Sequence, residues 1–127
     1  MLKRLVLLGI LVLGASPAHA LCNGLVSSSV TPFAFETITV STVSIGFTAA
    51  TAYPTGGDAP AIMAILTTET NSIRFRSDGA APSSTVGHLV AASSSIEVCG
   101  AQAVRTFRMI RASADATIQA TYYRAGP

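Results

Sequence analysis

Short runs in which apolar and polar residues alternate dominate the chain after residue 20. The alternation is clear at residues 36–41 and 73–77. A period of two puts successive side chains on opposite faces of a strand, whereas a helix needs apolar residues three or four apart over several turns. No sustained helical period occurs after residue 20. The pattern predicts strands at residues 25–30, 36–41, 43–48, 61–67, 73–77, 88–91, 95–99, 104–111 and 116–123.

Turn-forming residues separate these runs. Residues 49–60 and 78–82 are predicted loops, because Gly accepts a positive φ and Pro interrupts strand pairing. Pro32 is expected to end the first strand, and residues 124–127 are expected to form a frayed tail. Eight or nine short strands favour an all-β fold. We predict a two-sheet antiparallel β-sandwich, jelly-roll-like, with the sheets packed face to face.

The first twenty residues have the order of a secretory signal peptide. Lys3 and Arg4 precede an apolar run at residues 5–13, and Ala18-His19-Ala20 forms a small-x-small cleavage triplet. The run is too short for a membrane span, which needs about 20 apolar residues. A lipoprotein is disfavoured, because no small residue directly precedes Cys22. We therefore predict a signal-peptide helix at 1–20, a single domain at 21–127, and a secreted or periplasmic protein.

Removing the leader changes the charge balance. The whole chain has 8 basic and 6 acidic residues, but Lys3 and Arg4 leave with the leader. The remaining arginines and acids balance, so the domain lacks the basic surplus of a nucleic-acid-binding protein. No membrane partner is expected after signal cleavage.

Candidate catalytic and metal-binding groups are sparse. His88 is the only histidine left after the leader, and catalysis would need a nucleophile and an orienting acid beside it. No nucleophile-elbow motif and no closely spaced metal ligands occur. The sequence therefore predicts no catalytic residue, no metal and no cofactor. Two cysteines remain, Cys22 and Cys99. In an exported chain an even number favours a disulfide, and two free thiols are the alternative.

The arginines are the most distinctive polar residues. Arg74 and Arg76 share one strand face, while Arg105 and Arg111 share a face of a later strand and Arg108 lies on its other face. Ordinary cross-strand ion pairs are the simpler interpretation. The alternative is a subunit contact or a glycan or phosphate site, since Arg forms planar bidentate bonds. Of the adjacent Tyr122 and Tyr123, one should point inward and one outward. The candidate interface residues are Arg74, Arg76, Arg105, Arg108, Arg111 and Tyr123.

Several of these residues lie in segments that resemble a known group of proteins. The segments are Ile73-Arg74-Phe75-Arg76-x-Asp78-Gly79-x-x-Pro82, Gly87-His88-Leu89, Phe107-Arg108-x-Ile110-Arg111 and Tyr122-Tyr123-Arg124. They resemble small β-sandwich proteins encoded among tailed-phage virion genes, some of them head-decoration or tail-associated. The resemblance implies the sandwich fold and transfers no catalytic residue. The leader departs from that group, because virion proteins assemble in the cytoplasm.

Three functions follow, in order of preference. The first is an exported, non-enzymatic structural or interaction protein that self-associates, because the domain has few ionisable groups and near-zero charge. The second is a phage virion-associated (decoration) protein or a carbohydrate- or surface-binding module, suggested by the resemblance and by the arginine-bearing strands. The third is a hydrolase that uses His88. The expected partners are further copies of the chain, another protein or surface, or a glycan.

Overall fold

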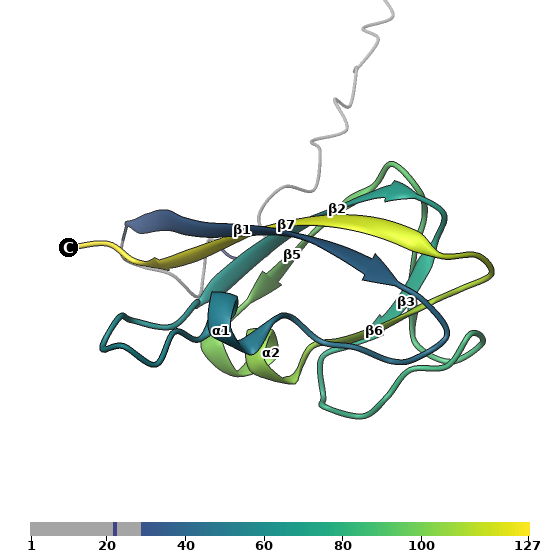
Figure 1. Cartoon of the computed structure of the whole chain (residues 1–127), viewed down its shortest axis with the longest axis horizontal. Coiled ribbons are helices and arrows are strands. Elements are labelled where there is room, and N and C mark those ends of the chain that lie inside the picture. The colour runs from purple at the N-terminus through teal and green to yellow at the C-terminus, as the bar shows by residue number, and fades with distance from the viewer. Residues whose placement is uncertain (1–21, 23–28) are drawn as a thin grey trace, which may run out of the picture.

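The computed structural model describes residue 22 and residues 29–127 (Figure 1). The predicted leader at 1–20 lies outside the described residues. So does most of the strand predicted at 25–30.

Seven strands form two antiparallel sheets in the described part of the chain. The four-stranded sheet has the order β1 (Val30–Val40), β7 (Ala116–Ala125), β2 (Met63–Thr70), β5 (Ser95–Cys99). The three-stranded sheet has the order β4 (His88–Val90), β3 (Ile73–Arg76), β6 (Arg108–Arg111). In Figure 1, β1 and β7 lie along one side, and β3, β6 and two short helices lie on the other. The predicted all-β sandwich is confirmed.

Alternating residues of the strands fill the core between the sheets. In β7, Ala116, Ile118, Ala120 and Tyr122 are buried, while the residues between them are only partly buried. Three phenylalanine rings stack on one another, with Phe47 and Phe107 buried in the core and Phe75 partly buried against it. Phe107 stacks on Phe47 at 4.8 Å and on Phe75 at 5.2 Å between ring centroids. Burying one such ring stabilises the fold by about 1.5–3 kcal/mol.

Strand β1 continues through Pro32, which was expected to end a strand. The pairing between β1 and β7 shifts register between Pro32 and Ala34, and among the strands that the structure describes β1 is at the edge of the sheet. A proline is tolerated at an edge or an irregularity because no ladder hydrogen bond from its nitrogen is needed there. The irregularity also lets Phe33 pack against the core.

Two predicted strands are wrong in part. At residues 43–48 only Ile45 forms a bridge, to Met109, and the chain then enters α1 (Ala49–Ala52), inside the predicted loop at 49–60. At residues 104–111 the strand begins only at Arg108, because α2 (Ala101–Thr106) precedes it. Gly100, with φ of 99°, redirects the chain from β5 into this helix. Helices of four and six residues are too short to produce a helical period in the sequence.

The chain is ordered beyond residue 123, so the predicted frayed tail is also wrong. Arg124 and Ala125 pair with Thr31 and Val30 of β1. The backbone N–H of Gly126 then donates to the carbonyl oxygen of Ser29 at 2.7 Å. These bonds extend the β1–β7 ladder to the end of the sheet.

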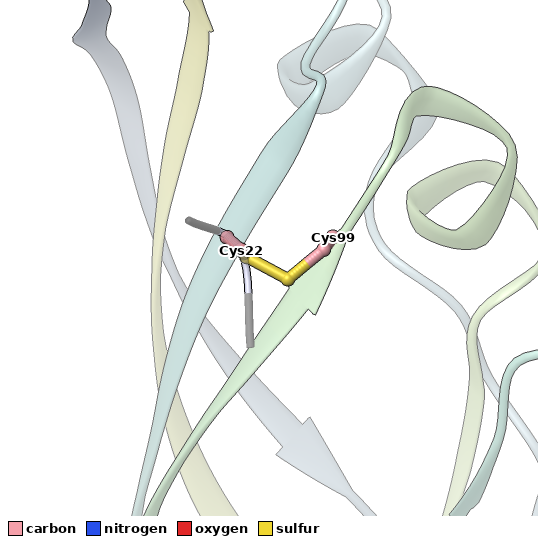
Figure 2. Close-up of a disulfide and its surroundings, with 2 residues drawn as sticks. All are labelled: Cys22 and Cys99. Carbon is pink, nitrogen blue, oxygen red and sulfur yellow. A yellow bond between two sulfur atoms is a disulfide. The ribbon is translucent and has the colours of Figure 1, made fainter. Parts of the chain in front are cut away.

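The predicted disulfide is present. Cys22 is bonded to Cys99 at the end of β5, with a Cα–Cα distance of 5.4 Å (Figure 2). Cys22 is buried, with 6% of its surface exposed. Such bonds are typical of proteins in oxidising compartments. Among the described helices, none has the length and apolar character to cross a membrane.

Candidate functional site

A surface hollow of about 720 Å³ lies where β3 ends and β4 begins. Between these strands, residues 77–87 form a loop that leaves the three-stranded sheet and returns to it. The hollow is lined by Phe75, Arg76, Ser77, Asp78, Val86, Gly87 and His88. The loop and the two strand ends together shape this site, which is formed by residues close in the sequence.

Specific contacts hold the loop in place. The guanidinium of Arg74 donates to the backbone carbonyls of Ser84 and Gly87, both at 2.9 Å. The hydroxyl of Thr106, in α2, donates to the carbonyl of Ser77 at 2.6 Å. Gly87 has φ of 126°, and a Cβ there would lie 2.9 Å from the carbonyl oxygen of Phe75. Only glycine fits this close approach, so the return of the loop depends on it.

An ion pair borders the hollow. Arg76 binds Asp78 through two hydrogen bonds, one of them from Nε to Oδ1 at 3.0 Å. The hydrogen bonds from Arg76 lower the pKa of the Asp78 carboxyl, and the backbone N–H of Ala80 also donates to it. Both side chains are accessible to water, 34% and 57% exposed, so a ligand can reach them.

A second guanidinium lies across from this pair. Arg108 of β6 is directly opposite Arg76 of β3 in the antiparallel register, and directly opposed residues project from the same face of a sheet. Arg108 is exposed and forms no ion pair with any residue that the structure describes. Since Arg74 shares the face of Arg76, three arginines and one carboxylate gather here. This face therefore carries a local positive surplus.

His88 also lines the hollow, and it lies directly opposite Phe75 in the β3–β4 register, so these two side chains project from the face of the sheet opposite to that of Arg74 and Arg76. Its ring centroid is 5.2 Å from that of Phe75, and its side chain forms no hydrogen bond within the described residues. Asp78, the acid in the hollow, is bound to Arg76 rather than to the imidazole. The imidazole of His88 therefore has the Phe75 ring beside it, and no described acid orients it.

The structure brings together only part of the interface set predicted from the sequence. Arg74, Arg76 and Arg108 share one face. Arg105 is in α2 rather than in a strand, and its guanidinium lies 5.0 Å from the ring of Tyr53. Arg111 pairs with Asp115 at 2.6 Å.

The two adjacent tyrosines point to opposite faces of the four-stranded sheet, as predicted. Tyr122 is buried and Tyr123 is on the outer face. The position of Tyr123 on the other sheet separates it from the three clustered arginines.

Sequence reasoning missed a polar cluster inside the sandwich. The hydroxyl of the fully buried Tyr122 donates to Oε1 of Glu36, which also accepts from the backbone N–H of Thr48 at 3.1 Å. Burial, reinforced by the Glu36 carboxylate, raises the pKa of Tyr122 far above its usual range. Burial likewise raises the pKa of Tyr53 to about 12, opposed by Arg105 and reinforced by Glu36. The alternation of β7 identifies which tyrosine is buried, but nothing in the sequence pairs it with Glu36.

The exposed side of β1 was also missed. Phe35 is 60% exposed, beside a shallow hollow of about 340 Å³ lined by Pro32, Phe33, Ala34, Phe35 and Thr121. Within the described part of the chain, β7 is the only strand that pairs with β1. A long strand edge and an exposed aromatic ring therefore occur together.

One group of side chains has the composition of a metal site. The ligand atoms of Cys22, Glu97 and Cys99 lie within 4.8 Å of one another. The two sulfurs are bonded to each other, however, so neither is a thiolate that could bind a metal.

The fold and the disulfide define a small, disulfide-bonded antiparallel β-sandwich. No protein family, curated protein or solved structure matches this chain.

Proposed function

We propose that this chain is an exported, non-enzymatic interaction protein that self-associates by pairing β1 with β1 of a second copy. Export is supported by the leader pattern at residues 1–20 and by the Cys22–Cys99 disulfide. A binding role is supported by His88, which packs on Phe75 and has no carboxylate to orient it in the described residues. The observation that carries the proposal is the edge of β1.

The edge of β1 lacks the features that usually keep strand edges apart. Natural edge strands are protected by charged residues, especially Lys, by Pro, by bulges or by short length. β1 has eleven residues, and its proline and register shift are confined to its first half. Its only charged residue is Glu36, whose carboxylate is bound by the buried Tyr122. Residues 34–40 thus form an extended edge with no charge directed at a partner.

The outer face next to this edge is also suited to contact between copies. Phe35 lies opposite Thr121, which lies opposite Ile65 in β2. The neighbouring row contains Thr37, opposite Gln119. None of these residues is charged, so a second copy meets no like-charge repulsion here.

Antiparallel pairing of two identical strands has two-fold symmetry, the commonest symmetry of homodimers. It would extend the four-stranded sheet across both copies and place both Phe35 rings on the same face. Covering a ring that is 60% exposed contributes on the order of 1–2 kcal/mol per copy. The new backbone hydrogen bonds add to this.

The test is sedimentation velocity of the disulfide-bonded protein over a range of concentrations, with two matched variants. Phe35→Lys introduces a charge at the proposed interface. Val43→Lys introduces the same charge at an exposed residue outside β1, where Val43 is 66% exposed. We expect the wild type and Val43→Lys to dimerise and Phe35→Lys to be monomeric. A wild type that is monomeric at its highest soluble concentration contradicts the proposal, as does a Phe35→Lys variant that dimerises normally.

A further inference from the structure

We propose that reduction of the Cys22–Cys99 disulfide creates a zinc site, with the two thiolates and the Glu97 carboxylate as ligands. The inference does not depend on dimerisation. It begins from the group of three metal-ligating side chains that comes together in the described part of the chain. The ligand atoms of these three side chains all lie within 4.8 Å of one another.

Strand β5 and its bond to residue 22 bring the three side chains together. Glu97 and Cys99 are two residues apart in β5, so they project from the same face of the strand. Cys22 reaches that face through its bond to Cys99, with 5.4 Å between the two Cα atoms (Figure 2). Because 77 residues separate the two cysteines, spacing along the sequence did not predict this group.

The Glu97 carboxylate is accessible to a metal ion. Glu97 is exposed, and it forms no ion pair with any residue that the structure describes. On the neighbouring strand β2, Ile65 lies opposite Glu97 and Met63 lies opposite Cys99, so β2 places no competing charge beside the group. The carboxylate oxygens can therefore bind a cation that the two sulfurs share.

A small-molecule thiol supplies the reduction. Its thiolate attacks the sulfur of Cys99, the less buried of the two cysteines, and Cys22 leaves as a thiolate. A second molecule of the reductant then releases Cys99 from the mixed disulfide, and the two reductant molecules leave joined by a disulfide of their own. The protein has then gained two electrons and two protons. Zinc binding to the two thiols releases these two protons.

The donor set and its spacing suit zinc. Zinc binds thiolate sulfur at about 2.3 Å and carboxylate oxygen at about 2.0–2.2 Å, so the ligand atoms of a tetrahedral site lie about 3.6–3.8 Å apart. Once their bond is broken, the two sulfurs reach this separation by rotation of the cysteine side chains. Thiolates favour zinc over magnesium or calcium. Three protein ligands leave the fourth position of the zinc open to water.

The metal ion would replace the covalent link between residue 22 and β5. In the oxidised protein the two are joined by the disulfide, and in the reduced protein they are joined through zinc. Because only the reduced, folded chain presents all three ligands, zinc stabilises that form and leaves the oxidised form unchanged.

The first test compares the oxidised protein with the reduced protein, which is freed of reductant and kept under anaerobic conditions. The probe is zinc chloride alone. We expect the reduced protein to bind one zinc ion and its unfolding temperature to rise by at least about 5 °C at saturating zinc. The oxidised protein is expected to show neither effect. Equal zinc binding by the two forms overturns the proposal.

Cobalt(II) then identifies the ligands of the reduced protein, because bound thiolates give a sulfur-to-cobalt charge-transfer band in the near ultraviolet. The absence of this band overturns the proposal. An amide NMR spectrum establishes whether the reduced chain is folded before metal is added. If it is unfolded, zinc is expected to refold it, because metal binding and folding are then coupled. A reduced chain that stays unfolded at saturating zinc contradicts the proposal.

Two variants that keep both cysteines test the third ligand. Glu97→Gln is expected to weaken zinc binding by the reduced protein at least about tenfold, because the site loses one of its three protein ligands. The matched control is Glu69→Gln, which removes the same charge from an exposed residue of β2 outside the group and should bind zinc like the wild type. Equal losses in the two variants, or no loss in Glu97→Gln, contradict the proposed ligand set. The Phe35→Lys variant should still bind zinc when reduced, which keeps this result separate from the test of dimerisation.

Discussion

Raising the pH above about 10 is expected to destabilise this protein, mainly through Tyr122. The side chain of Tyr122 has no exposed surface, and its burial, together with the Glu36 carboxylate, raises its pKa far above the ordinary value. In the unfolded chain a tyrosine ionises with a pKa of about 10. Below that pH both states are neutral and the full stability is present. Above it only the unfolded chain loses the proton, so stability falls as the pH rises.

The size of the effect follows from the two pKa values. Each pH unit above about 10 removes roughly 1.4 kcal/mol for a tyrosine that stays neutral when folded. At pH 12 the neutral Tyr122 therefore lowers the free energy of unfolding by about 2.7 kcal/mol relative to pH 10. Tyr53, whose pKa is raised to about 12, adds a smaller loss because its side chain is partly exposed and screened by water. Small domains have a total free energy of unfolding of about 5–15 kcal/mol, so the loss from Tyr122 is a large fraction of it.

The assay is urea unfolding followed by circular dichroism at several pH values from 8 to 12. The chain has no lysine after Lys3, and both cysteines are bonded, so tyrosines dominate the titration in this range. Tyr122→Phe should lower stability at pH 8 by about 1.5–3 kcal/mol, because it removes a hydrogen bond to a carboxylate. The same variant should lose less stability than the wild type between pH 10 and 12.

Tyr123→Phe is the matched control, because Tyr123 is adjacent in sequence and lies on the outer face of the sheet. It should retain the steep alkaline loss of the wild type. If Tyr122→Phe loses stability as steeply as the wild type, or if Tyr123→Phe flattens the curve equally, the assignment of the alkaline effect to Tyr122 is wrong.

Three further predictions concern stability and can be checked by thermal and urea unfolding. Gly87→Ala should destabilise the fold by at least about 1 kcal/mol, because residue 87 has a positive φ and its new Cβ would meet the carbonyl oxygen of Phe75. Gly56→Ala should be close to neutral, because the space around Gly56 is open. Equal effects of the two substitutions would refute this account of the loop. Replacing both disulfide cysteines with serine should cost about 4 kcal/mol in the chain-entropy model, given a separation of 77 residues, and an unchanged unfolding midpoint would show that the bond does not stabilise the domain. Phe107→Ala should cost about 3–5 kcal/mol, because this ring is fully buried and stacks on two others, and a loss below about 1 kcal/mol would contradict its central place in the core.

The strands that alternate clearly were predictable from the sequence. The strand predicted at 95–99 has the observed bounds of β5, and those at 73–77 and 116–123 differ from β3 and β7 by one or two residues at one end. In these segments one face is buried, so the period of two appears directly in the residue types. The strand prediction failed at residues 104–106, which belong to a helix. Val104 is the buried residue of this helix, and six residues are too few for the helical spacing of apolar residues to recur in the sequence.

The candidate sites were predictable only in part, because they depend on contacts across the fold. The alternation correctly placed Arg74 and Arg76 on one face. It could not place Arg108 opposite Arg76, because strand order and register are set by packing and not by either segment alone. Pro32 misled the prediction, since its effect depends on whether the strand is at an edge. The contact between Tyr122 and Glu36 spans 86 residues and leaves no local signal.

The bond between Cys22 and Cys99 also determines how the domain would carry a mechanical load. Tension applied at residue 22 and at the end of β7 passes through the two sulfurs into β5, and then through β2 to β7. β1 is outside this path, although it is the first strand along the part of the chain that the structure describes. The β1–β1 pairing of the proposed dimer is therefore not part of the route that runs through the disulfide. Reducing the bond would direct the same tension into β1, where Val30 lies opposite Ala125 and the ladder can open one pair at a time from its end.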